Sequence, residues 1–142
     1  MNVDGFEPPG WVRWLGVAVV AGVICYSSLI EPPSAGIPST GPFGLVGIDK
    51  WLHLLAYAGL VGSLAYALAT RRDPASAATA ALAVLLAFAY GIGIEFGQAV
   101  VPTRAFSTGD IAANAVGVAL GAVCWHLLVG VAERVGVDLS AT

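Results

Sequence analysis

Four long apolar segments constrain the fold of this chain more than any other feature of its sequence. They cover roughly residues 11–30, 49–70, 75–101 and 110–132. Each has close to the ~20 residues that an α-helix needs to cross the hydrocarbon core of a bilayer. With 142 residues, the chain is long enough for one domain. The sequence therefore predicts an all-α fold, an integral membrane bundle of four transmembrane helices.

The composition and the first segment both favour a retained membrane domain. The chain is 58% hydrophobic and 11% charged, and its mean hydropathy is +0.84. The first apolar run is longer than that of a signal peptide, and no A-x-A site follows it. Asp4 and Glu7 also place negative charge before it, where a signal peptide carries positive charge. We expect residues 11–132 to form the transmembrane domain, with an N-terminal tail over 1–10 and a C-terminal tail over 133–142.

The distribution of arginines predicts the orientation of the helices. Arg13 precedes the first segment, Arg71 and Arg72 join the second to the third, and Arg134 follows the fourth. All four lie on one side if both termini are cytoplasmic, as the positive-inside rule favours. We expect a multi-pass protein of the cell membrane, with the lipid bilayer as its surroundings. The net charge of −3 and the lack of a basic patch exclude a nucleic-acid partner.

Small residues recur at helical spacing in the third and fourth segments. The third contains Gly91-x-Gly93-x-x-x-Gly97, and the fourth contains Ala113, Gly117 and Gly121. Such spacing lets helix backbones approach closely in a membrane, where no hydrophobic effect drives association. We therefore expect close helix packing, although glycine is also simply common in membrane helices.

Eight polar residues gather at one end of three of these segments. They read Asp49-Lys50-x-x-His53, Glu95-x-x-Gln98, Arg104 and Asp110-x-x-x-Asn114. Because residues at i, i+3 and i+4 share a helix face, Tyr57 extends the stripe of Asp49 and His53. On the expected topology all three segments deliver these groups to the extracytoplasmic side. Since polar groups in a bilayer are costly and usually mark function, we predict one outward-facing site.

Structural roles are the alternative for several of these residues. Asp49 and Asp110 stand at helix N-termini, where a carboxylate can cap free N–H groups, and Ser107-x-x-Asp110 fits a capping box. Lys50 can extend its ammonium group to the lipid headgroups, and Arg104 can bind lipid phosphates.

Four of the polar residues lie within apolar stretches, where hydrogen bonding between helices is the structural alternative. They are His53, Glu95, Gln98 and Asn114. An ionised Glu95 without a partner would be costly there, so we expect it to be protonated, paired with Arg104 or Lys50, or bound to a metal.

Three kinds of chemistry fit this set of side chains. His53 near carboxylates can act as a general acid or base, with Lys50 or Arg104 stabilising negative charge. A divalent metal can be held by Asp49, His53, Glu95 and Asp110. The set can also form a recognition pocket for a polar headgroup or a peptide. The chain contains neither an established nucleophile motif nor a glycine-rich phosphate loop.

The motifs together resemble those of VanZ-like membrane proteins. Residues 49–57 are similar to their D-K-x-x-H-x-x-x-Y segment, and residues 95–98 to their E-x-x-Q element. Residues 102–117 resemble their P-x-R-x-F-S-x-x-D-x-x-x-N-x-x-G segment, and Tyr26-Ser27-Ser28 also suits the family. The resemblance covers about residues 15–130. It implies a polytopic membrane protein from a family named after a protein linked to low-level teicoplanin resistance, with no established general reaction.

These observations lead to one expected function and two alternatives. We expect an outward-facing site that binds or processes an amphiphilic envelope molecule, such as a lipid-linked precursor or a lipoglycopeptide. The alternatives are a metal-dependent membrane enzyme and a bundle whose polar groups only lock the packing. The sequence assigns no specific cofactor and is compatible with a homo-oligomer.

The expected function divides the candidate residues into two groups. The catalytic candidates, which would transfer protons, are His53, Glu95 and Asp110. The substrate-binding candidates are Asp49, Lys50, Tyr57, Gln98, Arg104 and Asn114, among which Lys50 and Arg104 would hold anionic groups.

Overall fold

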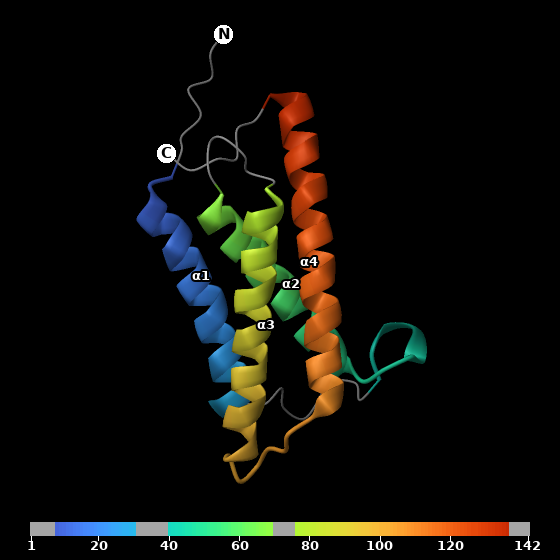
Figure 1. Cartoon of the computed structure of the whole chain (residues 1–142). Helices are drawn as coiled ribbons and strands as arrows, with labels where there is room; N and C mark the ends of the chain where they lie inside the picture. Colours follow the sequence, from blue (N-terminus) through green and yellow to red (C-terminus); the bar gives the residue numbers. More distant parts are fainter. Residues whose placement is uncertain (1–7, 31–39, 70–75, 137–142) are drawn as a thin grey trace.

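Four helices make up most of the molecule (Figure 1). The structure, a computed structural model, describes residues 8–30, 40–69 and 76–136. The helices are α1 (Gly10–Cys25), α2 (Ile48–Leu68), α3 (Ala77–Ala99) and α4 (Thr108–Val135). A π-helical turn, η1 (Tyr26–Ile30), continues α1, and a short 3₁₀ turn, η2 (Pro42–Gly44), precedes α2. The predicted all-α fold is confirmed.

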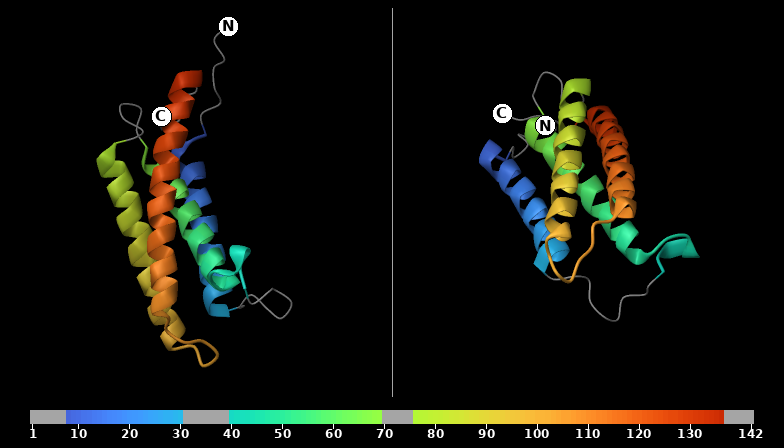
Figure 2. Two further views of the ribbon diagram at one scale, coloured as in Figure 1. Left: turned by 90° about the vertical axis from the view of Figure 1, so that its right-hand side faces the viewer. Right: turned by 60° about the horizontal axis from the view of Figure 1, so that its bottom comes forward.

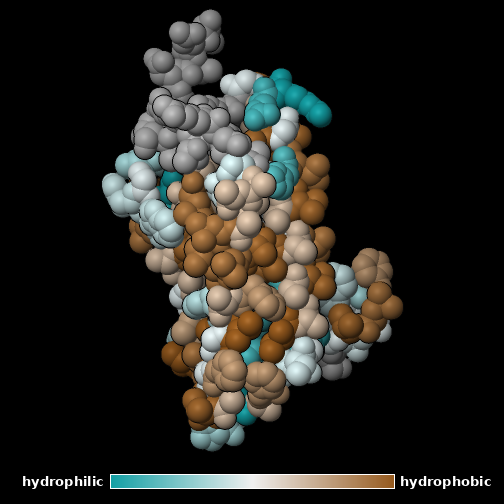
Figure 3. Space-filling view, in the orientation of Figure 1, coloured by the Kyte–Doolittle hydropathy of each residue, from teal (hydrophilic) through white to brown (hydrophobic). Residues whose placement is uncertain are grey.

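Each of the four helices is long and apolar enough to cross a bilayer. The spans are Gly10–Ile30, which joins α1 to η1, then Ile48–Leu68, Ala77–Ala99 and Thr108–Val135. Large apolar side chains such as Leu55, Leu85 and Leu127 are exposed on the outside of the bundle. Figure 3 shows hydrophobic side chains over the middle of one face. This surface is that of a multi-pass membrane protein, whose lipid-facing residues need no burial within the protein.

The helix boundaries differ from the sequence prediction at several points. The third helix ends at Ala99 rather than at residue 101, and the first begins at Gly10. The fourth continues to Val135, so residues 133–135 are helical and do not belong to a tail. Gly136, in the left-handed region at φ 74°, ends this helix without the steric cost that other residues meet there. The expected ends at residues 70 and 75, most of the N-terminal tail and the last six residues lie outside the described residues.

Two glycines bring α4 close to the backbone of α2. A Cβ atom added at Gly117 would lie 2.4 Å from the carbonyl oxygen of Leu54, and one at Gly121 would lie 2.6 Å from that of Ala58. No side chain fits at either position unless the helices separate. The predicted close approach is thus observed at these two residues, and it brings the start of α4 next to the start of α2.

The glycines of α3 differ in their role. A Cβ at Gly91 would lie 2.9 Å from Cε1 of Tyr57, and one at Gly97 would lie 3.1 Å from a methyl group of Leu29. Gly93 has no neighbour of this kind within 4 Å. Gly91 therefore makes room for Tyr57, whereas a side chain at Gly93 would meet no other part of the described chain.

The end of α1, the start of α2, the end of α3 and the start of α4 meet at one end of the bundle. This is the lower end in Figure 1, and it comes forward in the right-hand view of Figure 2. The segments that carry the predicted polar residues therefore converge, although they are far apart in the sequence.

The opposite end contains Arg13, whose position differs from the prediction. It lies one turn inside α1 and is buried, because the helix begins at Gly10 directly after Pro9. Its guanidinium group lies 4.3 Å from the centre of the Tyr66 ring and donates a hydrogen bond to the Tyr66 carbonyl oxygen (3.1 Å). Arg134 lies at the same end of the bundle, in the last turn of α4. Arg71 and Arg72 lie outside the described residues.

Candidate functional site

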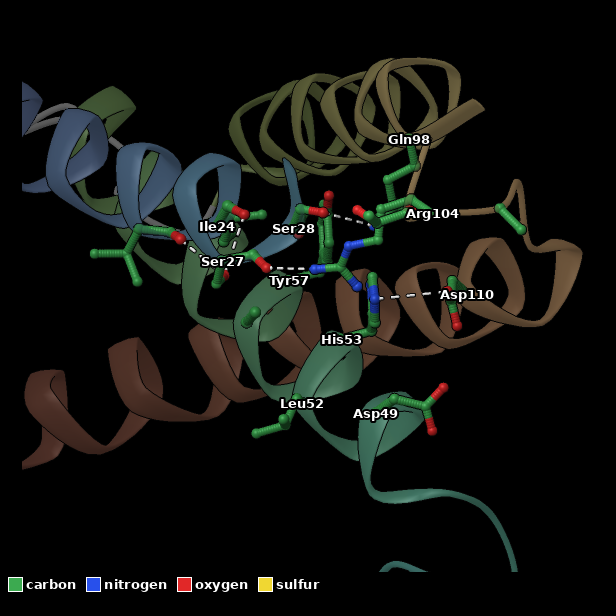
Figure 4. Close-up of a pocket in the computed structure, with 14 residues that line it drawn as sticks. Ile24, Ser27, Ser28, Asp49, Leu52, His53, Tyr57, Gln98, Arg104 and Asp110 are labelled. Atoms are coloured by element: carbon green, nitrogen blue, oxygen red, sulfur yellow. Dashed lines mark hydrogen bonds and ion pairs between the residues drawn. The ribbon is translucent and has the colours of Figure 1, made fainter. Parts of the chain in front are cut away.

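A pocket of about 500 Å³ lies at the convergent end of the bundle (Figure 4). Its lining comes from the end of α1 and η1, the start of α2, the end of α3, the connection between α3 and α4, and the start of α4. The polar lining consists of Ser27, Ser28, Asp49, His53, Tyr57, Gln98, Thr103, Arg104 and Asp110. The apolar lining consists of Val23, Ile24, Leu52, Ala56 and Ala105. The pocket is thus lined by both polar and apolar side chains.

The structure brings all nine candidate residues to this end of the bundle. Six of them line the pocket: Asp49, His53, Tyr57, Gln98, Arg104 and Asp110. The other three lie behind that lining: Lys50 beside Asp110, Asn114 beside His53, and Glu95 close to both His53 and Asp110.

Lys50 of α2 binds the carboxylate of its neighbour Asp49 and that of Asp110 on α4. Its ammonium group lies 2.5 Å from Oδ2 of Asp49 and also binds Oδ1 of Asp110. Opposite charges this close satisfy each other, so Lys50 is directed into the bundle rather than toward lipid headgroups. Since Asp49 and Lys50 both belong to α2, it is the pair with Asp110 that links the start of α2 to the start of α4.

Ser107 is the N-cap residue of α4. The Ser107 hydroxyl accepts a hydrogen bond from the backbone N–H of Asp110 (3.1 Å). This is the serine half of the predicted capping box. Asp49 lies in the first turn of α2, where the helix dipole favours a negative charge.

His53 connects the two helices through its ring nitrogens. Nδ1 lies 3.0 Å from Oδ1 of Asn114, and Nε2 lies 3.7 Å from Oδ2 of Asp110. Because an amide oxygen only accepts hydrogen bonds, Nδ1 carries the hydrogen and donates it. The His53 ring also lies parallel to that of Tyr57, with an interplanar angle of 3°. The imidazole is therefore held with Nε2 facing Asp110.

Glu95 is fully buried, with 0% of its surface exposed. Its Oε2 accepts a hydrogen bond from the backbone N–H of Ser107 (3.0 Å). Of the three states expected for Glu95, the ion pair with Arg104 or Lys50 is not formed, because each cation binds elsewhere. Among the described residues, no cationic side chain lies within ion-pair distance of Glu95.

Arg104 and Gln98 bind the end of the first span. An Arg104 N–H (Nη2) donates to the carbonyl oxygen of Ser27 (2.8 Å), and Nε2 of Gln98 donates to that of Ser28 (3.2 Å). The last carbonyl groups of a helix have no partner within the helix, so side chains of other elements can satisfy them. We did not assign Ser27 and Ser28 to the site from the sequence. The sequence signal that could have identified these two serines is their position in the last turn of an apolar segment.

Several buried polar atoms around the pocket have no hydrogen-bond partner among the described residues. They are Tyr57 Oη, Glu95 Oε1, Gln98 Oε1, Arg104 Nε and Asn114 Nδ2. Buried polar groups in proteins are nearly always hydrogen-bonded. The site therefore retains both donors and acceptors with which to bind a further polar partner.

Three of the side chains meet the geometric requirement for holding a metal ion. One ligand atom each from His53, Glu95 and Asp110 lies within 4.8 Å of the other two. The pocket can therefore bind an ion, a polar group or both.

Comparisons with known proteins agree with the motif pattern. The model of a protein family described as VanZ/LLP1 matches residues 18–129, which include all nine candidate residues and parts of all four helices. No curated protein and no solved structure matches the chain.

Proposed function

Because this chain belongs to the VanZ/LLP1 family, we propose that it is a membrane protein that binds an amphiphilic molecule of the cell envelope in this pocket. The ligand class is a hydrocarbon chain with an anionic headgroup, as found in a lipid-linked precursor or a lipoglycopeptide. The observation that supports this most is that the pocket lining combines polar side chains with apolar ones.

The pocket offers apolar side chains that fit a hydrocarbon chain. Val23, Ile24, Leu52 and Ala56 line the pocket, and all four belong to membrane-spanning helices. A lipid chain lying along these residues remains at the depth of the bilayer that it already occupies. The volume of about 500 Å³ lies within the usual range for small-molecule pockets. It accommodates a headgroup and the first part of a chain.

The pocket favours an anionic headgroup because of Arg104. The ammonium group of Lys50 already faces the carboxylates of Asp49 and Asp110. Arg104 binds the neutral carbonyl oxygen of Ser27, and within the described ranges no carboxylate lies at ion-pair distance from it. A guanidinium group suits phosphate and carboxylate, which it can bind with two parallel N–H groups. We assign the recognition of the headgroup to Arg104 rather than to Lys50.

Binding of defined amphiphiles to the full chain in lipid nanodiscs tests this proposal. The probes are a polyprenyl phosphate, the matching uncharged polyprenol and the lipoglycopeptide teicoplanin. We expect a charged probe to bind at least about tenfold more tightly than polyprenol, since hydrogen bonds between charged groups contribute about 1.5–3 kcal/mol. Preference for polyprenyl phosphate identifies a lipid-linked precursor, and preference for teicoplanin identifies a lipoglycopeptide.

A pair of arginine variants provides the control. Arg104→Gln should remove most of the preference for the charged probe, whereas Arg134→Gln, at the other end of α4, should leave it unchanged. Equal binding of charged and uncharged probes, or an equal effect of both variants, would contradict the proposal.

A further inference from the structure

Side chains from three helices converge at the base of the pocket. They are His53 of α2, Glu95 of α3 and Asp110 of α4, and one ligand atom from each lies within 4.8 Å of the others. We propose that these three residues bind a divalent transition-metal ion, with Zn²⁺ as the best fit. Imidazole and carboxylate are both ordinary Zn²⁺ ligands. Tetrahedral ligands lie roughly 3.4 Å apart, so the ion would draw the side chains together by up to about 1.4 Å.

The contacts of His53 orient it as a metal ligand. Its Nδ1–H donates to Oδ1 of Asn114, which leaves the lone pair of Nε2 directed toward Asp110. Metal-binding histidines nearly always donate their other ring N–H to an oxygen acceptor in this way. The lone pair and the Asp110 carboxylate would repel each other at 3.7 Å, and a cation or a second proton between them removes the repulsion.

The carboxylates of Glu95 and Asp110 are each held by a neighbouring group, as His53 is. Oε2 of Glu95 accepts the backbone N–H of Ser107, and Oδ1 of Asp110 binds the ammonium group of Lys50. One oxygen of each carboxylate is therefore fixed by a neighbour, and Glu95 Oε1 and Asp110 Oδ2 remain as metal ligands. Outer contacts of this kind hold ligating carboxylates in place.

The burial of Glu95 is an independent observation that points to a cation. Its side chain is fully buried, and its Oε1 is a buried atom with no hydrogen-bond partner among the described residues. An ionised carboxylate in such a place is costly unless a positive charge accompanies it. Lys50 and Arg104, the nearby cations, bind other groups. A bound metal ion supplies the missing charge.

The position of the ion beside the pocket connects it to ligand binding. His53 and Asp110 both line the pocket, whereas Glu95 lies behind them. Three protein ligands leave one coordination position for a water molecule or a ligand. The metal site itself goes beyond the proposed function, since it depends on these three residues and not on any bound amphiphile.

Metal binding by the full chain, freed of any histidine tag, tests the inference. The protein is purified in detergent, stripped with a chelator and titrated with Zn²⁺ in competition with a chromophoric chelator, and elemental analysis gives the stoichiometry. We expect one Zn²⁺ per chain. Glu95→Gln and His53→Ala should each weaken Zn²⁺ binding at least about tenfold. The glutamine retains an oxygen that can accept the Ser107 N–H, so the fold should survive this change.

Two exposed residues of α4 serve as matched controls. Glu133→Gln and His126→Ala change the same residue types away from the pocket and should leave the affinity for Zn²⁺ unchanged. Zn²⁺ should also raise the thermal unfolding temperature of the wild type but not of Glu95→Gln. Mn²⁺ binding with the same dependence on the variants would support the site as well.

Failure of the wild type to bind either ion, or an equal loss in the control variants, would overturn the inference. Because no lipid probe is present, this result does not depend on the outcome of the amphiphile binding experiment.

Discussion

Nδ1 of His53 lies 3.0 Å from Oδ1 of Asn114, although the two residues are 61 positions apart. The contact joins α2 to α4 at the level of the pocket. It determines which ring nitrogen of His53 carries the hydrogen, and it directs the other toward Asp110. Asn114 is therefore a positioning residue for His53.

Replacement of Asn114 should weaken metal binding without removing any ligand. We expect Asn114→Ala to lower the affinity for Zn²⁺ by about 10–100-fold, the usual cost of losing an outer hydrogen bond to a ligating histidine. Asn114→Asp keeps an oxygen acceptor for Nδ1–H and should retain most of the affinity. The chelator competition assay measures both variants. Equal affinities in the two would show that the contact with His53 has no positioning role.

The close approach of α2 and α4 predicts a sharp difference between two glycines of one helix. A Cβ at Gly117 would lie 2.4 Å from the Leu54 carbonyl oxygen, whereas one at Gly130 would have no neighbour within 4 Å. Gly117→Ala should lower the free energy of unfolding in detergent by roughly 1–3 kcal/mol, as overpacking does. Gly130→Ala should cause no loss, because alanine favours helix. Equal free energies of unfolding for the two variants would mean that α2 and α4 can separate at Gly117 without cost.

The cap of α4 allows stability to be separated from the metal site. Ser107→Ala removes the hydroxyl that accepts the Asp110 N–H and should cost about 1 kcal/mol of stability. The backbone N–H of Ser107, which holds Glu95, remains. Zn²⁺ affinity should therefore change less than twofold. Ser76→Ala, which removes the cap of α3, is the matched control for stability. A large loss of Zn²⁺ affinity in Ser107→Ala would contradict the claim that the backbone N–H of Ser107, and not its hydroxyl, holds Glu95.

The proposed orientation places the pocket outside the cytoplasm. Thr103 lies at the pocket end, and Ser76 lies at the end that also carries Arg134. Arginines favour the cytoplasmic side. After Cys25 and Cys124 are replaced by alanine, Thr103→Cys should react with a membrane-impermeant maleimide on intact cells. Ser76→Cys should react only after permeabilisation, and the reverse pattern would invert the topology.

Hydropathy and helix connectivity were enough to predict the spans and the end of the bundle where the polar groups meet. Antiparallel neighbours necessarily bring the start of α2, the end of α3 and the start of α4 to one side. The spacing of Gly117 and Gly121 also indicated where α4 approaches another helix. These features follow from the length of the apolar segments and the spacing of residues within them, both of which can be read directly from the sequence.

The pairing of the polar groups could not be predicted in the same way. Glu95 binds the backbone N–H of Ser107, and every residue but proline offers such a group. Arg104 binds a carbonyl oxygen of the π-helical turn, whose departure from α-helix has no evident sequence signal. Arg13 is buried against Tyr66, which is a contact between two helices. Such pairings depend on the relative rotation of the helices.

Native mass spectrometry of the protein released directly from membranes tests the central claim, that the pocket holds an anionic amphiphile through Arg104. The wild type and Arg134→Ala should retain a bound molecule with the mass of such an amphiphile. Arg104→Ala should lose it while keeping its helical content and its insertion into the membrane. If Arg104→Ala retains the same molecule, or if it only unfolds at a lower temperature with no separate loss of ligand, the polar residues serve packing and the claim is wrong.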